Sequence, residues 1–323
     1  MTAIDILILP SAGFSALGLT LDAFDAANRI AGTGQARPFD WRLLAVGSDR
    51  IELKHGLVMP AQALATARPR DLALVLGIGA PGPEEIEMRL AAPDARAASA
   101  WLAHARRRGA TLASGCTGAF LLGDAGALDG RRCTTTWWLS GVLARRCPDA
   151  IVCADEIVVE DRGVWTAGAV HSQLDLAIAL IERYGGKTLA AETRRRLAAP
   201  VQASQAPFIS AVAMASGDED VIAFEAYVAR RLGRAIALED VARALMVSQR
   251  TLARRVRAIT GLSPSRFIQK IRLASALRLI GQTRMPLSEI AVRVGLADAA
   301  VLHRLVVRHT GQAPGHFRSR AAA

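Results

Sequence analysis

The chain has 323 residues, 51% of them hydrophobic and 21% charged, and this length is enough for two domains with packed cores. Its formal net charge of +11 is uneven, because residues 1–190 contain 19 Lys and Arg against 20 Asp and Glu, whereas residues 191–323 contain 21 against 9. This charge favours a polyanionic partner for the second part alone, although a solvated basic face would give the same count.

Neither a membrane span nor a secretory signal is predicted. No apolar run approaches the ~20 residues that cross a bilayer, and Met1–Asp5 has no basic segment before its first apolar run. The cysteines show neither a CxxC motif nor metal-ligand spacing, so we expect a cytoplasmic protein without a metal or cofactor. A disulfide among the last three stays open. The cysteines are Cys116, Cys133, Cys147 and Cys153.

Residues 1–190 alternate short apolar runs with longer amphipathic ones. This alternation predicts an α/β domain with a doubly wound, mostly parallel sheet and helices on both faces, and ligands bind at the carboxyl ends of such strands. Strands are predicted at Ile4–Leu9, Trp41–Val46, Asp71–Leu76, Ala110–Ser114, Ile151–Cys153, Ile157–Val159 and Val164–Thr166. Helices are predicted at Leu17–Ile30, Ala95–Arg108, Thr117–Ala125, Trp137–Arg146 and His171–Tyr184.

The clearest local pattern of this part is Ala113–Phe120. A strand ends, Ser114 and Gly115 allow a tight turn, and a helix begins, which is the pattern of a nucleophile elbow with Cys116 at its tip. The positive end of the helix dipole would favour the thiolate. Cys116 is then a nucleophile, an oxidisable thiol that forms a sulfenic acid, or a small residue that lines a pocket. Nucleophilic catalysis also needs a base, and none of the three histidines of this part can be placed beside Cys116.

Three consecutive motifs, Ser114–Leu122, Gly126–Arg132 and Thr134–Trp137, carry a resemblance. They resemble the PfpI-like, class I glutamine amidotransferase-like domain, in the GlxA-like version that is fused to AraC-type regulators, which implies a flavodoxin-like fold. The family pattern T-T-H-W has its histidine where this chain has Thr136, and its enzymes have a glutamate where the matching residue is Asp22. No catalytic residue is therefore assigned, and a cysteine-dependent amidase, protease or glyoxalase using Cys116 is the alternative.

Without the catalytic residues of the family, these motifs still indicate a ligand pocket. Backbone N–H groups at the start of the helix could hold a carboxylate, and Asp22 could pair with a cationic group of the same ligand, unless it is merely solvated. An amino-acid-like or betaine-like effector would suit the pocket, and the resemblance also implies a nitrogenous metabolite. The predicted lining comprises Asp22, Gly77, Gly79, Gly115, Cys116, Thr117 and Thr136.

A linker is predicted at residues 191–217, between a domain of residues 1–190 and one of residues 218–323. The segment contains Pro200 and Pro207, and such a change of composition indicates an interdomain connection. Its three adjacent arginines, Arg194–Arg196, either contact DNA or form a solvated cluster.

The second domain contains a degenerate repeat of about 50 residues, which is typical of one supersecondary unit used twice. Val241-Ala242 matches Ile290-Ala291, and the later matches are Gly261 with Gly311, Pro264 with Pro314, and Phe267 with Phe317. The pattern predicts an all-α domain with two helix-turn-helix modules, which could reach two successive major grooves. Helices are predicted at Val221–Leu232, Leu238–Leu245, Ser265–Ile280 and Leu287–Val294, with turns at Met246-Val247 and Gly295-Leu296.

The first module supplies most of the predicted base contacts. Ser248 is predicted to cap the recognition helix, and the early residues of such a helix enter the major groove. We expect Arg250 and Arg254 to contact bases, with Thr251 as a further candidate, because arginine can hold guanine O6 and N7 together. Phosphate contacts are predicted for Arg255 and Arg257.

The second module is poorer in base-reading groups. Asp298 caps its recognition helix, but Ala299 and Ala300 occupy positions where polar side chains would read bases. The candidates that remain are His303, Arg304 and Arg308, which would add affinity and shape readout more than base specificity, or serve only phosphates and stability.

The ordered duplicate, from Leu238 to Phe267 and again from Leu287 to Phe317, resembles the AraC/XylS DNA-binding domain. Both resemblances together imply a ligand-responsive regulator that binds double-stranded promoter DNA, responds to a small effector, contacts RNA polymerase and dimerises through its first domain. Activation is expected from the resemblance, and repression is the other possibility.

Overall fold

The computed structural model describes residues 1–32, 38–200, 205, 219–310 and 312–318. The chain divides into two compact units, one made of residues 1–153 and 157–201, the other of residues 154–156 and 202–323. Most of the predicted linker, residues 201–204 and 206–217, lies outside the described residues.

A seven-stranded sheet forms the centre of the first unit, in the order β10-β11-β7-β6-β1-β2-β5. All neighbouring strands pair in parallel except β10 with β11, which form an antiparallel hairpin. The predicted doubly wound, mostly parallel sheet is therefore confirmed. The strands are β1 (Thr2–Ile8), β2 (Phe39–Ala45), β5 (Gln62–Ala63), β6 (Leu72–Val75), β7 (Thr111–Gly115), β10 (Val158–Asp161) and β11 (Val164–Ala167).

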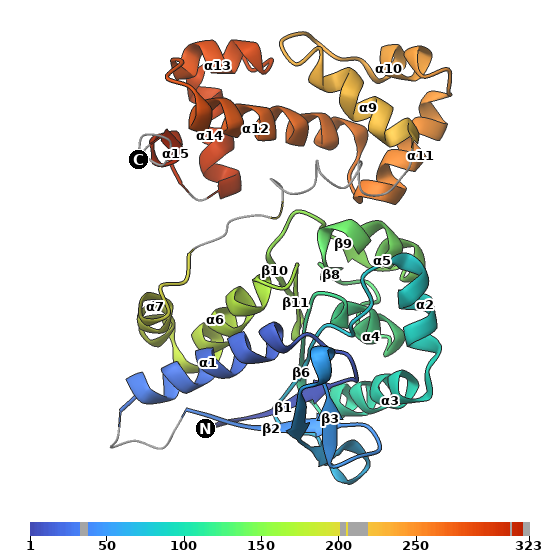
Figure 1. The fold of residues 1–323 in the computed structure, drawn as a ribbon, viewed down its shortest axis with the longest axis vertical. Helices are drawn as coiled ribbons and strands as arrows, with labels where there is room; N and C mark the ends of the chain where they lie inside the picture. The colour runs from blue at the N-terminus through green and yellow to red at the C-terminus, as the bar shows by residue number, and fades with distance from the viewer. Residues whose placement is uncertain (33–37, 201–204, 206–218, 311, 319–323) are drawn as a thin grey trace. The chain divides into compact units, whose positions relative to one another are not determined.

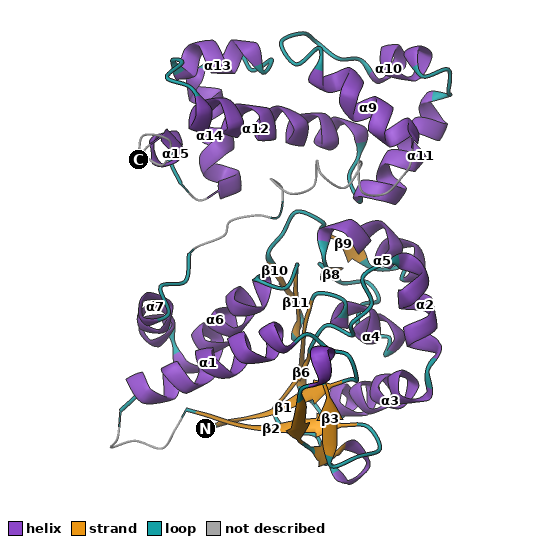
Figure 2. Ribbon diagram, in the orientation of Figure 1, coloured by secondary structure: helices purple, strands orange, loops and turns teal. Residues whose placement is uncertain are grey.

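Helices cover both faces of the sheet, as Figures 1 and 2 show. Successive residues of a strand point to opposite faces, so each inner strand contributes to two cores. Leu7 and Val75 belong to the core on one side, and Ile6 and Leu74 to the core on the other. One face carries α1 (Phe14–Ile30), α6 (Ser172–Gly185) and α7 (Lys187–Arg196), and the other carries α2 (Pro83–Ala91), α3 (Pro93–Arg107), α4 (Gly118–Asp124) and α5 (Ser140–Arg146).

Two small sheets complete the first unit. The hairpin of β3 (Arg50–Glu52) and β4 (Val58–Pro60) was not predicted. The predicted strand at Ile151–Cys153 exists as β9 (Ile151–Val152), but it pairs with β8 (Arg132–Cys133) outside the central sheet.

The end of the first unit differs from the sequence-based expectation. Arg194–Arg196 belong to α7, which packs against α1 and α6, and not to a linker. Arg194 pairs with Asp175 at 3.0 Å, and Arg195 pairs with Glu192 on the same helix at 2.8 Å. Both arginines thus have a carboxylate partner within the domain, which favours the solvated cluster over the DNA contact.

The regular elements of the second unit are all helices in its described residues, and they form both predicted modules (Figure 2). The long helix α12 runs between them (Figure 1). Phe224 of α9 stacks on Phe267 of α12, with 5.7 Å between the ring centroids. The helices are α9 (Glu219–Ala229), α10 (Leu238–Ala244), α11 (Gln249–Thr260), α12 (Pro264–Gln282), α13 (Leu287–Arg293), α14 (Ala299–Thr310) and α15 (Pro314–Arg318).

The segment between α9 and α10 joins the two modules. A Cβ atom at Gly295, in the turn of the second module, would lie 2.1 Å from the carbonyl oxygen of Leu232, so this turn packs directly on the segment. Arg272 of α12 donates a hydrogen bond of 2.8 Å to the carbonyl oxygen of Arg234. The segment thus contacts both α12 and the second module.

Candidate effector site and DNA interface

The turn after β7 has the geometry of an elbow, as predicted. Cys116 has φ +54°, in the left-handed region, and its N–H donates to the carbonyl oxygens of Ala167 and Gly168 at 3.0 and 2.9 Å. The Thr135 hydroxyl donates to the Cys116 carbonyl at 2.8 Å. Three chain segments therefore meet at the cysteine, and the strained backbone is held from both sides.

The thiol of Cys116 lies in a turn whose packing disfavours its charged form. Burial raises the pKa of the Cys116 thiol, and this effect outweighs the hydrogen bonds from Thr117 that lower it. Desolvation of the charged form therefore opposes the stabilisation of the thiolate that was expected from the helix dipole.

The predicted glycines have different roles. Gly77 lies against the elbow, since a Cβ there would come within 3.3 Å of Thr117 Oγ1 and 3.4 Å of Cys116 Cβ, and the Ile78 N–H donates to Thr117 Oγ1 at 2.9 Å. Gly79, with φ +75°, instead packs on the loop after β1, where its Cβ would lie 2.4 Å from the Ser11 carbonyl oxygen. The structure thus places Gly77 and Thr117 beside Cys116. Gly79 is instead required by its positive φ and by its close packing on Ser11.

Gly115 is covered by Gln173, a residue that the sequence analysis did not single out. A Cβ at Gly115 would lie 1.9 Å from Gln173 Oε1, and Gln173 Nε2 donates to the buried hydroxyl of Thr20 at 2.9 Å. Asp22, in contrast, is exposed on α1. The buried polar group that α1 presents towards the elbow is therefore Thr20, and the structure does not place Asp22 with it.

Two buried hydroxyls near the elbow have no hydrogen-bond partner among the described residues. They are Ser114 Oγ, in the strand that ends at the elbow, and Thr136 Oγ1, in the segment after Thr135, and both residues are fully buried. An unsatisfied buried polar group costs about 1–3 kcal/mol, and such groups are uncommon in native structures.

The first recognition helix, α11, presents its arginines to solvent. Ser248 caps it as predicted, since its Oγ accepts the Thr251 N–H at 3.0 Å. Leu252 and Val256 are fully buried, whereas the opposite side carries exposed arginines. The Thr251 hydroxyl accepts from Ser248 at 2.9 Å, so part of its hydrogen-bonding capacity is used. The exposed arginines are Arg250, Arg254, Arg255 and Arg257.

Arg255 differs from the other three because it pairs with Asp220 of α9. Its charge is used within the domain, so a phosphate contact would compete with this ion pair. Arg250, Arg254 and Arg257 have no carboxylate partner among the described residues.

The second recognition helix, α14, is capped by Asp298, whose Oδ1 accepts the Val301 N–H at 2.7 Å. Leu302 and Val306 of this helix are fully buried in the core of the domain. The predicted candidates His303, Arg304 and Arg308 are all exposed.

An α/β domain with a strained, buried cysteine turn and a second unit with two capped, arginine-bearing helix-turn-helix modules define a two-domain DNA-binding transcription regulator. Residues 20–183 match the DJ-1/PfpI family, and residues 241–320 match a helix-turn-helix domain family. The chain belongs to the DJ-1/PfpI family, in the group of AraC-family regulators that join such a domain to an AraC-type DNA-binding domain.

Named transcription regulators match this chain over most of their own length. The HTH-type transcriptional regulator CdhR of Pseudomonas aeruginosa is 24% identical over 97% of this chain and 90% of its own. The HTH-type transcriptional regulator GlxA of Rhizobium meliloti is 28% identical over 71% of this chain and 72% of its own. An AraC family transcriptional regulator from Pseudomonas putida shares the fold, with a TM-score of 0.51 and 22% identity over 61% of this chain and 100% of that one.

Two further findings bear on the sequence analysis. No helix of the described residues is both long and apolar enough to span a bilayer. All four cysteines are free thiols, so the disulfide that the sequence left open is not formed in this structure.

Proposed function

We propose that the protein is a ligand-responsive, sequence-specific transcription regulator, whose first unit binds a small effector at the cysteine turn and whose second unit binds a promoter. The observation that carries the DNA-binding part is the pair of exposed, capped recognition helices, of which α11 presents Arg250 and Arg254 without carboxylate partners in the described residues. Arginines at these positions are suited to guanine edges in the major groove.

The effector part rests on the unsatisfied hydroxyls of Ser114 and Thr136. Both can accept hydrogen bonds from the N–H groups of a nitrogenous metabolite and can donate to its oxygens. The surrounding polar side chains, Thr20, Thr135 and Gln173, are also uncharged, which favours a small ligand with neutral polar groups over one held by an ion pair with Asp22. Ligand affects DNA binding only if it prefers the DNA-competent or the incompetent state.

An enzymatic role for Cys116 has little support. The raised thiol pKa disfavours both nucleophilic attack and oxidation to a sulfenic acid, since the thiolate is the reactive form. Thr136, which stands where the resembling enzymes have histidine, cannot act as a general base at neutral pH. Our proposal is therefore a binding domain without catalysis.

Activation through RNA polymerase, dimerisation through the first unit and a cytoplasmic location belong to the same proposal and rest on the family resemblance. Dimerisation has one structural support, which is that Phe14, Leu57 and Val58 are exposed apolar side chains of this unit. Apolar side chains that are exposed in a single chain are often covered by a partner chain in a dimer.

The test uses the full chain in two stages. Selection from a random duplex pool should yield a defined sequence motif, and recovery of unrelated sequences would contradict specific binding. A thermal-shift screen with amino acids, betaines and amides should then identify an effector that stabilises the wild type and is chemically unchanged after incubation. Consumption of the hit, abolished in Cys116→Ser, would instead establish an enzyme.

A further inference from the structure

A second groove lies in the first unit, away from the cysteine turn. It has a volume of about 340 Å³ and lies between the segment that follows β5 and helix α3. In the sheet, β6 and β1 separate β7, which carries the cysteine turn, from β2 and β5. Its lining includes apolar Val46, Leu64 and Ala97, and polar Arg68, Trp101 and His104.

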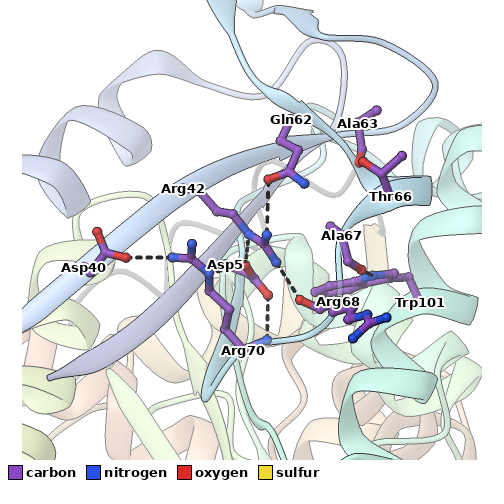
Figure 3. A network of polar contacts seen from close by, with 10 residues as sticks. All are labelled: Asp5, Asp40, Arg42, Gln62, Ala63, Thr66, Ala67, Arg68, Arg70 and Trp101. Carbon is purple, nitrogen blue, oxygen red and sulfur yellow. Dashed lines mark hydrogen bonds and ion pairs between the residues drawn. The ribbon is translucent and has the colours of Figure 1, made fainter.

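A buried charge network fixes the wall of this groove (Figure 3). Asp5 of β1 is fully buried, accepts from Arg42 Nε at 2.6 Å, and accepts the Arg70 N–H at 2.9 Å. Arg42 also donates to the Arg68 carbonyl oxygen at 2.5 Å. From the other side, Trp101 Nε1 donates to the Ala67 carbonyl oxygen at 3.0 Å. The backbone of residues 67–70 is thus held at three points, and this restraint pre-organises the positions from which their side chains extend.

The side chain of Arg68 is not part of that network. It is exposed, and its guanidinium has neither a hydrogen bond nor an ion pair among the described residues. Figure 3 shows it extending towards Trp101 with no contact drawn to it. The indole N–H of Trp101 is already bonded to Ala67, which restrains the ring, and Trp101 is among the residues that line the groove. The residues that line the groove in the described part of the chain include no acidic side chain.

We propose that this groove binds a small aromatic carboxylate, with the carboxylate on the Arg68 guanidinium and the flat ring against Trp101 and the apolar lining. The guanidinium matches a carboxylate with two parallel hydrogen bonds, and aromatic rings stack favourably in offset or edge-to-face arrangements. The volume is at the small end of ligand sites, which fits one ring system with one acid group. This site is separate from the effector site proposed at Cys116.

The experiment measures binding of 1-naphthoate to the full-length protein by isothermal titration calorimetry. Saturable binding is expected in the wild type, and Arg68→Gln should weaken it about tenfold or more through loss of the charge-assisted hydrogen bonds. Arg96→Gln is the matched control, because Arg96 is also exposed, lies on α3 and does not line the groove. Ala97→Glu, at an exposed position of the lining, should abolish binding without disturbing the core.

Three results with the groove variants and ligands would overturn the proposal, and a fourth comes from a variant at the cysteine turn. These are the absence of binding in the wild type, unchanged affinity in Arg68→Gln, and equal affinity for the neutral 1-naphthamide, which would reduce the site to an apolar groove. Thr136→Val should leave naphthoate binding unchanged, and its loss in this variant would place the ligand at the cysteine turn instead. Failure here leaves the proposed effector site standing, since that site depends on other residues.

Discussion

Met246 and Gly295 occupy the same position in the two helix-turn-helix turns, and both have a left-handed backbone, with φ of 54° and 74°. The next residue donates an equivalent hydrogen bond in each turn, from Val247 to Ala242 at 3.0 Å and from Leu296 to Ala291 at 2.8 Å. The surroundings differ, because Met246 is 94% exposed, whereas Gly295 packs on Leu232. The equivalent position therefore accepts a side chain in the first module, whereas in the second module there is no space for one.

Replacement of Met246 by glycine should stabilise the second unit. A left-handed backbone destabilises the folded state of an ordinary residue by about 1–2 kcal/mol, and glycine removes this cost. Glycine also makes the unfolded chain more flexible, which offsets about 0.5–1 kcal/mol of the benefit. The net gain in the free energy of unfolding is therefore expected to be about 0.5–1 kcal/mol. The chain has no Trp after Trp165, so protection of α10 and α11 from hydrogen exchange is the appropriate measurement. Met246→Ala keeps the backbone cost and should show no gain.

Gly295→Ala should do the opposite. Its Cβ would come 2.1 Å from the Leu232 carbonyl oxygen, a backbone atom that cannot move without moving the segment between α9 and α10. We expect a loss of about 2 kcal/mol or more in the free energy of unfolding of the second unit. Differential scanning calorimetry should show a lower transition for this unit, and wild-type stability would exclude the close packing described for this turn.

Arg254→Ala should weaken specific DNA binding far more than nonspecific binding, by about 1–3 kcal/mol for a lost guanine contact. Anisotropy titrations with the selected sequence and with a scrambled duplex, at one salt concentration, measure the two affinities. Arg243→Ala is the control, because Arg243 is exposed on α10 but pairs with Glu239 and Asp240. Equal losses on both duplexes would assign Arg254 to a phosphate.

Thr136→Val should stabilise the ligand-free first unit by about 1 kcal/mol, because it replaces a buried hydroxyl without a partner by a methyl group of similar shape. The same change should abolish the response to the effector. Tryptophan fluorescence during urea unfolding follows this unit, since every Trp of the chain lies in it. Thr135→Val removes the hydrogen bond to Cys116 and should destabilise instead, so equal effects would refute the assignment.

Glu225 of α9 predicts a pH dependence. Its Oε2 is buried without a partner in the described residues, and burial raises the pKa of this carboxyl from 4.5 to about 7. The folded state then binds the proton more tightly than the unfolded state, so stability falls as the pH rises from 4.5 through about 7. Glu225→Gln should remove this fall. Calorimetric transitions of both proteins across that range test it, and parallel curves would contradict it.

The local features of the recognition helices could be predicted from the sequence. Ser248 and Asp298 cap their helices as expected, because a cap depends on residues three positions apart. The elbow at Cys116 was predictable for the same reason. The repeat made the two modules predictable as a pair, even where Met246 in one turn replaces Gly295 in the other.

Long-range contacts were the part that the sequence could not supply. Gln173 of α6 reaches Gly115 at the end of β7 and Thr20 of α1, and no local pattern marks it. Asp22 was chosen by comparison with a family glutamate, but its phase on α1 leaves it exposed and turns Thr20 inward. The thiol of Cys116 was expected to be acidic because dipole effects are local, whereas desolvation depends on everything that packs around the turn.

The contacts of Leu232 with the Gly295 turn, and of Arg234 with Arg272, have a consequence for the promoter. These contacts join the second helix-turn-helix module to the first through α12, so the distance and the rotation between the two modules are fixed. An inserted base pair rotates the second half of the operator by about a tenth of a helical turn, and two modules with a fixed spacing cannot adapt to this rotation. Operators for this protein should therefore tolerate substitutions between their two halves much better than a single insertion.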